Sequence, residues 1–433
     1  MTIFSRYRHI LAALPVLALA MAVTSCADDG AEPPVEDGGV PIRLTTTVAT
    51  VTEGSFGGTA HNSRAGWIGE FTDNADNALT QFRCFAFYGN ERFMDNALVS
   101  RNPANGVCTW SENTHYWPKD DPLHFYAFAP YDYRTGDTQN TLTGQTSEFN
   151  LTVENNRVLL RDFEANNPPL SDVIYAMARD QRATTSGGSV NLDFRHALSC
   201  IEIYMINYHP YLDVDFHGAD FLSLKYKADF IFPENGSTSA SNQGHWTNYN
   251  PLVKKFNTSW LGSGDSEVIN GSTIFFAKAP HRTDFSSEPA PVKVLADDHA
   301  LFLLPQTLKR WTTADKCNTD EFNSGQQYDT SLPENAGYKP CLILMGRVRD
   351  SRTGVSIVDD YKDIGNWLVV PLNPNADGSD FTWQPGKKYR YYVTFGGNGN
   401  NMGWTVDGHP VFNNIEVGVI VEDWEYKDII IYQ

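Results

Sequence analysis

The chain contains the run Leu123-His124-Phe125-Tyr126-Ala127-Phe128-Ala129, in which every residue except His124 is apolar or aromatic. A half-buried strand alternates apolar and polar residues, whereas a short continuous apolar run is typical of a strand covered on both faces. The stretch therefore predicts a strand that is covered on both faces.

Other segments of the chain alternate with the period of two that marks a half-buried strand. Near the start, Ile42, Leu44, Thr46, Val48 and Thr50 alternate with other residues, and Val190, Leu192 and Phe194 do so later. Further strands are expected at 199–207, 300–304, 340–348, 367–371, 388–395 and 415–421. Turn dipeptides such as Asn105-Gly106 and Asp407-Gly408 separate these runs, and few stretches show a helical period. The pattern predicts an all-β protein built from β-sandwiches.

The length of 433 residues is enough for two domains of about 150–200 residues each, after a leader is removed. Ser186-Gly187-Gly188-Ser189 is the strongest linker candidate because small, flexible residues favour a connection between domains. We therefore predict an N-terminal β-sandwich domain over residues 42–187 and a C-terminal β-sandwich domain over residues 188–433.

The first residues have the layout of a bacterial lipoprotein signal. Basic residues precede an apolar run over 10–23, and the small residues after it end at Cys26. We predict a signal peptide over residues 1–25 and a lipid on Cys26; an ordinary signal peptide with a chance cysteine is the alternative. The apolar run is shorter than the about 20 residues of a transmembrane helix, so we expect an anchored protein outside the cytoplasm.

Residues 26–41 are acidic and rich in proline and glycine, which predicts a tether. The whole chain is also acidic, with 33 Lys and Arg against 52 Asp and Glu and a net charge of −19. Phosphate binding depends on a positive surface, so the charge argues against nucleic acid as a partner. It argues equally against a polybasic contact with anionic lipid.

Besides Cys26 the chain has five cysteines, and an exported domain is free to form disulfides. Cys84–Cys108 and Cys317–Cys341 are both candidate pairs, and sequence alone does not fix the connectivity. Cys200 lies in an apolar, strand-like run, so we expect it to be a buried small hydrophobe.

The motifs of common enzymes are missing from the sequence. It has no Gly-x-Ser-x-Gly elbow, His-Glu-x-x-His pair or phosphate-binding loop. The stretch Asn373–Gly378 copies part of an EF-hand, but position twelve is Gln384 where calcium requires a bidentate glutamate. We expect no enzyme activity, no cofactor and no metal site.

Six segments, taken in order along the chain, resemble the fimbrillin family, the pilin precursors of Bacteroides-group bacteria. The first joins a tryptophan, a polar turn and the apolar strand Leu123–Ala129. The second resembles the strand that closes the family's first domain, and the third resembles the strand that opens its second domain. The last three are a strand that ends in Pro-Gln, a Pro-Gly turn with the strand after it, and a tryptophan motif near the C-terminus. The six segments are Trp117–Tyr131, Ser171–Ala176, Val190–Ile203, Leu301–Gln306, Pro385–Tyr391 and Val421–Trp424.

The resemblance implies two transthyretin-like β-sandwich domains in tandem and a role in assembling fimbriae. It also implies a precursor that reaches the outer membrane and cell surface as a lipoprotein, where an arginine-specific, trypsin-like protease cuts it. The acidic pair after Cys26 is similar to the surface-export signal of such lipoproteins. Removal of the first strand then opens a groove, which a strand from another fimbrial subunit fills.

The residues of this chain can be matched to those steps. We expect the displaced first strand at Ile42, Leu44, Thr46, Val48 and Thr50. A loop of small and polar residues follows over 53–63, and exposed loops of this kind are where proteases cut. We predict cleavage between Arg64 and Ala65, with Arg43 as the alternative.

The end of the chain offers a candidate donor strand with apolar alternation, at Ile429, Ile430, Ile431 and Tyr432. The competing interpretation is that these residues form the last strand of their own sandwich. A tip or accessory subunit, which accepts a strand and donates none, also stays open. A different function class is a surface lipoprotein that binds glycans through exposed aromatic residues and never polymerises.

Overall fold

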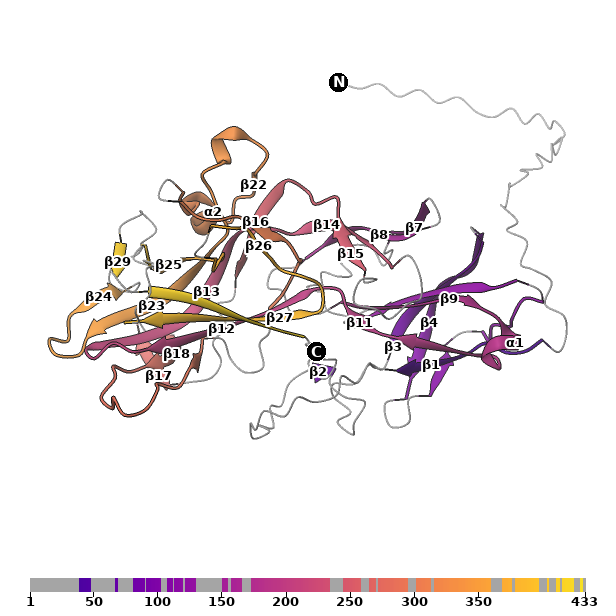
Figure 1. Ribbon diagram of the computed structural model, residues 1–433, viewed down its shortest axis with the longest axis horizontal. Coiled ribbons are helices and arrows are strands. Elements are labelled where there is room, and N and C mark those ends of the chain that lie inside the picture. The colour runs from indigo at the N-terminus through magenta and orange to yellow at the C-terminus, as the bar shows by residue number, and fades with distance from the viewer. Residues whose placement is uncertain are drawn as a thin grey trace, which may run out of the picture.

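The computed structural model describes most of the chain after residue 38 (Figure 1). The described ranges are 39–47, 67–68, 81–89, 91–102, 107–111, 113–119, 121–129, 150–154, 157–165, 173–233, 244–257, 265–269, 272–294, 301–312, 315–359, 368–375, 378–396, 403–404, 410–412, 415–423 and 429–430. Strands make up nearly all of their regular structure, so the all-β prediction is confirmed. The helices within these ranges are short: α1 (Ala183–Ser186), α2 (Thr319–Ser324) and a 3-10 turn at Pro333–Asn335.

A six-stranded antiparallel sheet organises the first part of the chain. One of its two central strands is β6, the continuous apolar run Leu123–Ala129. In order across the sheet the strands are β11 (Arg195–His196), β9 (Ile174–Gln181), β6 (Leu123–Ala129), β3 (Gln81–Tyr88), β4 (Glu91–Arg101) and β5 (Cys108–Trp110).

Both faces of this sheet are covered, as the continuous apolar pattern of β6 predicts. On β6, Phe125 and Ala127 belong to one hydrophobic cluster, while Tyr126 and Phe128 belong to another. The first cluster also contains residues of a small parallel sheet, β1 (Arg43–Thr47) with β10 (Ser189–Asp193). The second cluster continues into a four-stranded sheet of β15 (His245–Thr247), β14 (Lys227–Ile231), β8 (Arg157–Glu164) and β7 (Asn150–Glu154).

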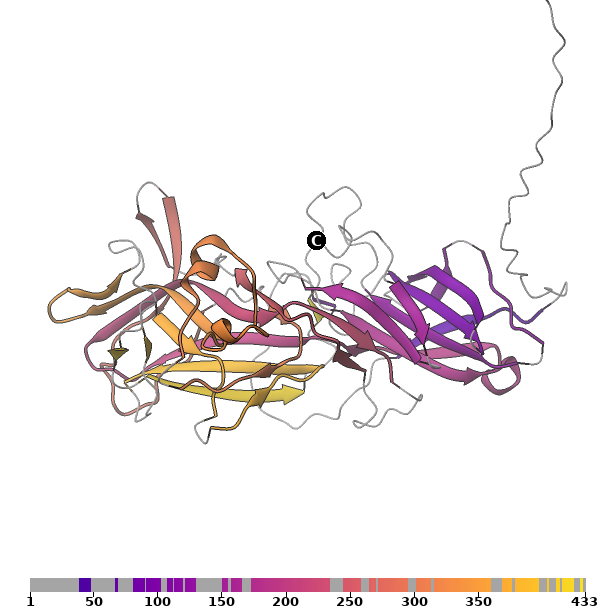
Figure 2. The same ribbon diagram turned by 90° about the horizontal axis from the view of Figure 1, so that it is seen from above.

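Two further sheets, of five and ten strands, lie at the opposite end of the molecule from β3 and β4 in both ribbon views (Figures 1 and 2). One contains β19 (Val292–Lys293), β12 (Ser199–Asn207), β27 (Lys387–Phe395) and β30 (Ile415–Asp423), with β20 (Leu301–Leu303) also paired to β12. The other contains β17 (Asp265–Ile269), β18 (Ser272–Ala279), β13 (Leu212–Lys225), β23 (Cys341–Asp350), β25 (Leu368–Pro371), β28 (Gly403–Trp404) and β29 (Pro410–Phe412), with β16 (Leu252–Asn257), β22 (Tyr328–Asp329) and β24 (Ser356–Asp359) at its side.

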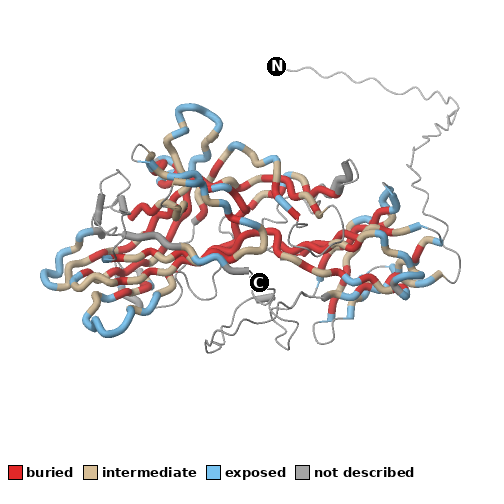
Figure 3. The backbone as a smooth tube through the Cα atoms, in the orientation of Figure 1, coloured by how far each residue is buried: buried red, intermediate tan, exposed pale blue. Residues whose placement is uncertain are grey.

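Two further pairs complete the described strands: β2 (Trp67–Ile68) with β31 (Ile429–Ile430), and β21 (Thr307–Leu308) with β26 (Phe381–Thr382). The buried residues follow the inner strands of the large sheets, and the exposed ones gather on the connections (Figure 3). Cys200 is 2% exposed in β12, which confirms the prediction of a buried small hydrophobe.

Candidate strand-exchange site

Strand β1 lies between two segments that are distant from it in the sequence. On one side it pairs in parallel with β10, so that Leu44 is opposite Val190 and Thr46 is opposite Leu192. On the other side the backbone nitrogen of Ile42 donates to the carbonyl of His115 at 2.8 Å. Hydrogen bonds on both sides make β1 an inserted strand rather than a loose edge.

The side chains of β1 and of the residue before it follow the predicted alternation. Ile42 and Leu44 are 2% and 4% exposed, and both belong to the cluster that packs against the six-stranded sheet. Arg43 and Thr45 are exposed, and Thr46 is half-buried. Over residues 42–45, the even-numbered side chains therefore point into the hydrophobic core and the odd-numbered ones point to solvent.

Side chains of the six-stranded sheet also hold β1 in place. The indole nitrogen of Trp110 on β5 donates to the carbonyl of Ile42 at 2.9 Å. Nε of Arg101 on β4 donates to Oγ1 of Thr46 at 2.9 Å. Burial lowers the pKa of Arg101 to about 10, so its guanidinium stays protonated at neutral pH and continues to donate to Thr46.

The turn before β10 is shaped around the entry of β1. Gly188 has φ +82°, in the left-handed region that favours glycine, and its carbonyl accepts from the backbone nitrogen of Arg43 at 2.9 Å. A Cβ at Gly188 would lie 3.0 Å from Cγ1 of Val40 and 3.4 Å from the carbonyl oxygen of Pro41. The Ser186–Ser189 stretch, predicted as a linker, thus contacts β1 directly and helps to hold it in place.

Several predicted site residues lie outside the described residues. They are Cys26, Val48, Thr50, Arg64, Ala65, Ile431 and Tyr432. The described part of the predicted donor segment is β31, whose Ile429 and Ile430 pair antiparallel with Ile68 and Trp67 of β2. The C-terminal segment therefore lies beside residues that follow the predicted cleavage position closely in sequence.

Sequence reasoning identified 190–194 as a strand but not as the partner of the first strand. It also did not assign Arg101, Trp110 or Gly188 to the site. Trp117 carried the family resemblance, and its side chain lies in the same cluster as Ile42. The alternation in β1 and β10 is the same whichever strand each pairs with, so no local signal connects them.

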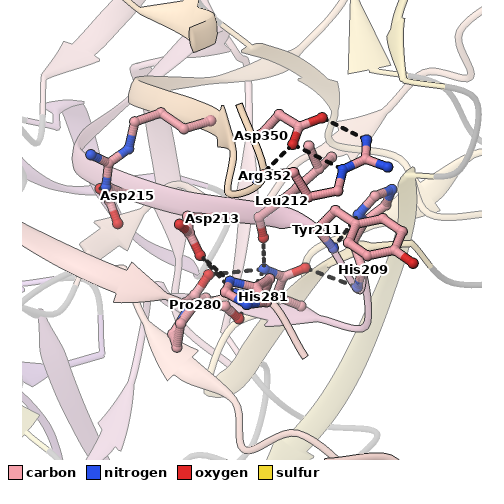
Figure 4. A network of polar contacts seen from close by, with 12 residues as sticks. His209, Tyr211, Leu212, Asp213, Asp215, Pro280, His281, Asp350 and Arg352 are labelled. Carbon is pink, nitrogen blue, oxygen red and sulfur yellow. Dashed lines mark hydrogen bonds and ion pairs between the residues drawn. The ribbon is translucent and has the colours of Figure 1, made fainter. Parts of the chain in front are cut away.

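A second polar cluster lies at the start of β13 (Figure 4). Oδ1 of Asp213 accepts from the backbone nitrogen of His281 at 2.9 Å and contacts its Nδ1 at 2.8 Å. Burial alone would raise the pKa of Asp213, but the bonds from His281 outweigh it and hold the pKa below its usual value. Nearby, Arg352 pairs with Asp350 at 2.7 Å and lies over the ring of Tyr211, 4.2 Å from its centroid. Because Tyr211 is 43% exposed, the cluster presents an aromatic ring to solvent.

Among the described residues, no group of three or more His, Cys, Asp and Glu side chains could hold a metal ion. None of the helices within the described ranges is long and apolar enough to cross a membrane.

Comparison with known proteins gives one sequence family and several solved structures. Residues 70–424 match the model of a family described as Fimbrillin-like. No curated protein sequence matches the chain significantly.

The similar solved structures include a fimbrial protein from Bacteroides vulgatus, at 13% identity and a TM-score of 0.45 over 88% of this chain and 99% of that one. The tip fimbrial protein Mfa3 from Porphyromonas gingivalis is similar at 10% identity and a TM-score of 0.32, covering 83% and 97% of the two chains. The fimbrial anchor protein Mfa2 from the same organism is similar at 12% identity and a TM-score of 0.26, covering 91% and 99%.

Proposed function

Because the chain belongs to the fimbrillin-like family, we propose that it is a fimbrial subunit, or a tip or accessory adhesin, that exchanges its first strand for one from a neighbour. Members of the family are structural, non-enzymatic proteins, and membership implies a cell-surface location. In this proposal the sheets form two transthyretin-like sandwiches in tandem, and β10 and β11, which follow the predicted boundary at residue 187, pack within the first of them. Cys26 carries the lipid that anchors the precursor to the outer membrane, and residues up to 41 are the tether.

The burial of Ile42 and Leu44 in the hydrophobic cluster that contains Val190 and Leu192 of β10 is the observation that carries the proposal. Removing two such side chains loses roughly 3–6 kcal/mol of hydrophobic stabilisation, at about 1.5–3 kcal/mol each. That is a large share of the about 5–15 kcal/mol that a folded protein has in total. Removal also leaves the edge of β10 without its backbone partner, and such an edge accepts another strand. A neighbour's strand with apolar residues at alternate positions restores both contributions.

Cleavage after Arg64 separates β1 from the rest of the chain and makes Ala65 the new N-terminus. The alternative, Arg43, lies within β1 with its backbone nitrogen bonded to Gly188. A protease binds an extended, unpaired backbone, so a residue held on both sides in a sheet is a poor substrate until the strand leaves. The position of Arg43 therefore favours Arg64 as the processing site.

The donor strand in this proposal is the C-terminal segment that includes Ile429, Ile430, Ile431 and Tyr432. Its pairing with β2 gives it a resting partner within the same chain. Cutting at Arg64 would free the chain just before β2, which connects processing to release of the donor.

The test is to treat the purified full chain and its Arg64→Ala variant with a trypsin-like protease at limiting dose. We expect the unmodified chain to lose its first strand and form a ladder of SDS-resistant oligomers, and the variant to stay monomeric. Arg43→Ala is the matched control and should still polymerise. Oligomers from the Arg64→Ala variant, or none from the unmodified chain after a confirmed cut, would refute the proposed mechanism.

The alternative is a surface lipoprotein that binds glycans without polymerising, and the exposed Tyr211 beside Arg352 is the observation in its favour. Aromatic rings with adjacent polar groups are a common means of holding sugars through their apolar faces. Binding of the uncleaved chain to a glycan array, lost in Tyr211→Ala, would support this alternative.

A further inference from the structure

Two cysteines that are separated in sequence meet in a small hydrophobic cluster that includes Cys341 and Ile343 of β23. Sγ of Cys341 lies 3.6 Å from Sγ of Cys317, and 24 positions separate them along the chain. Cys341 is 0% exposed and Cys317 is 6% exposed. They pack with four apolar side chains, Leu222, Phe322, Ile343 and Val369.

The backbone around these cysteines is held together by contacts that do not involve sulfur. The backbone nitrogen of Lys316 donates to the carbonyl of Gly337 at 2.9 Å, and Lys316 forms a parallel bridge with Tyr338. Nε1 of Trp311 donates to the carbonyl of Pro340 at 2.9 Å. These non-covalent contacts place the two chain segments side by side without a bond between the sulfur atoms.

The other candidate pair lacks this placement. Cys84 is on β3 opposite Ala97 of β4, whereas Cys108 is on β5 opposite Arg101 of β4. Because β4 lies between β3 and β5, the two backbones are separated by a whole strand. Adjacent strands are about 4.8 Å apart, so two spacings exceed the roughly 7 Å limit between the Cα atoms of a disulfide.

We propose that Cys317 and Cys341 form a disulfide that closes the segment carrying α2 onto the sheet of β13, β23 and β25. A sulfur–sulfur bond is about 2.05 Å long, so the two atoms must approach by about 1.5 Å, which side-chain rotation within the cluster can supply. The oxidant is itself a disulfide: a protein disulfide of an oxidoreductase outside the cytoplasm in the cell, or oxidised glutathione in the refolding test below.

The exchange takes place in two balanced steps. The Cys317 thiolate attacks one sulfur of the oxidant, forming a mixed disulfide and releasing one oxidant thiol. The Cys341 thiolate then attacks Sγ of Cys317 and releases the second oxidant thiol. The protein loses two electrons and two protons, and the oxidant becomes two thiols.

Burial determines when this bond can form. Burial raises the pKa of Cys341, so its reactive thiolate is scarce once the protein has folded. The bond therefore forms during folding and, once buried, resists reduction. It fixes the segment whose Glu321 accepts hydrogen bonds from the backbone nitrogen of Ser223 on β13 at 2.9 and 3.1 Å.

The first test maps the bond in the full chain. Unfolded, reduced protein is refolded with oxidised and reduced glutathione, alkylated under denaturing conditions and digested. We expect a linked peptide joining Cys317 to Cys341, lighter than the two free peptides by two hydrogen atoms, with Cys84, Cys108 and Cys200 alkylated. Alkylation of Cys317 and Cys341 in the refolded protein, or a link between other cysteines, would overturn the proposal.

The second test compares the melting temperature of protein refolded with oxidised glutathione and of protein refolded in a strong reductant, which keeps the bond from forming. We expect reduction to lower the Tm of the unmodified chain by several degrees, because the closed loop no longer restricts the unfolded state. Cys317→Ala and Cys341→Ala should not respond to the reductant, whereas the control Cys108→Ala should respond like the unmodified chain. A Tm of the unmodified chain that is unchanged by complete reduction would also overturn the proposal.

Discussion

Leu44 of β1 lies directly opposite Val190 of β10 in a parallel pairing, and the two buried side chains share one hydrophobic cluster. This relationship joins the first described strand to a segment far along the chain. Its partner is therefore not a strand that would leave with it when the chain is cut nearby. The arrangement meets the physical requirement for a strand that can be exchanged.

The burial of Leu44 predicts a large cost of truncation. Leu44→Ala should lower the free energy of unfolding by about 2–5 kcal/mol, because a buried leucine leaves both lost hydrophobic contact and a cavity. Thr45→Ala is the matched control on the exposed side of the same strand, and its effect should be below about 1 kcal/mol. Urea unfolding of the full chain measures both. Similar small effects for the two variants would contradict the packing of β1 described above.

Two adjacent glycines next to β1 allow the effect of backbone strain to be measured separately from the effect of steric crowding. Gly187 and Gly188 both have positive φ, at +60° and +82°, so alanine is strained at either position. Only at Gly188 would the new Cβ press on Val40 and Pro41, while at Gly187 it would meet nothing within 4 Å. We expect Gly188→Ala to speed hydrogen exchange at the Arg43 amide well beyond the effect of Gly187→Ala. Equal exchange in the two variants would contradict this close approach.

Glu321 predicts a loss of stability as the pH rises. Burial raises the pKa of its carboxyl to about 7 against an ordinary value near 4.5, and the bonds from Ser223 offset only part of that shift. The folded protein therefore holds a proton between about pH 4.5 and 7 that the unfolded chain releases. The stability from this group is complete below pH 4.5, falls by about 3 kcal/mol up to pH 7, and is level above it.

Unfolding measured from pH 4.5 to 8 checks the contribution of Glu321. Glu321→Gln removes the titration and should flatten the curve in that window relative to the unmodified chain. Glu334→Gln replaces an exposed carboxylate in the 3-10 turn after α2 and serves as the control. If Glu321→Gln and Glu334→Gln give the same slope as the unmodified chain, the buried carboxyl does not control this dependence.

Much of the strand content could be predicted from local pattern. The continuous apolar run of Leu123–Ala129 predicted a strand covered on both faces, and β6 has packed clusters on each side. The segment expected at 388–395 became β27, and the one expected at 199–207 became β12. These predictions succeeded because side-chain alternation is a property of one strand and does not depend on its neighbours.

Strand pairing could not be predicted in the same way. Nothing in Ile42 or Leu44 indicates that β1 pairs in parallel with β10, because the choice of partner depends on how all the sheets pack together. The Gly187-Gly188 dipeptide suited a linker equally well. In the structure, however, Gly187 ends α1 and the carbonyl of Gly188 accepts a hydrogen bond from the backbone nitrogen of Arg43. The domain boundary at 187, the cleavage at Arg64 and the donor strand stay predictions.

An engineered disulfide that ties β1 to β10 tests most directly whether β1 must leave the sandwich before subunits assemble. Thr45 and Asn191 are exposed, lie opposite each other in the β1–β10 register, and their Oγ1 and Oδ1 atoms are 3.4 Å apart. Parallel partners have Cα atoms near the 4.4–6.8 Å range of disulfides, so a Thr45→Cys/Asn191→Cys variant can be crosslinked. After protease treatment the oxidised variant should stay monomeric, and adding reductant should restore the SDS-resistant ladder that Thr45→Cys alone forms throughout. A full ladder from the oxidised, crosslinked variant would show that assembly does not require β1 to dissociate from β10.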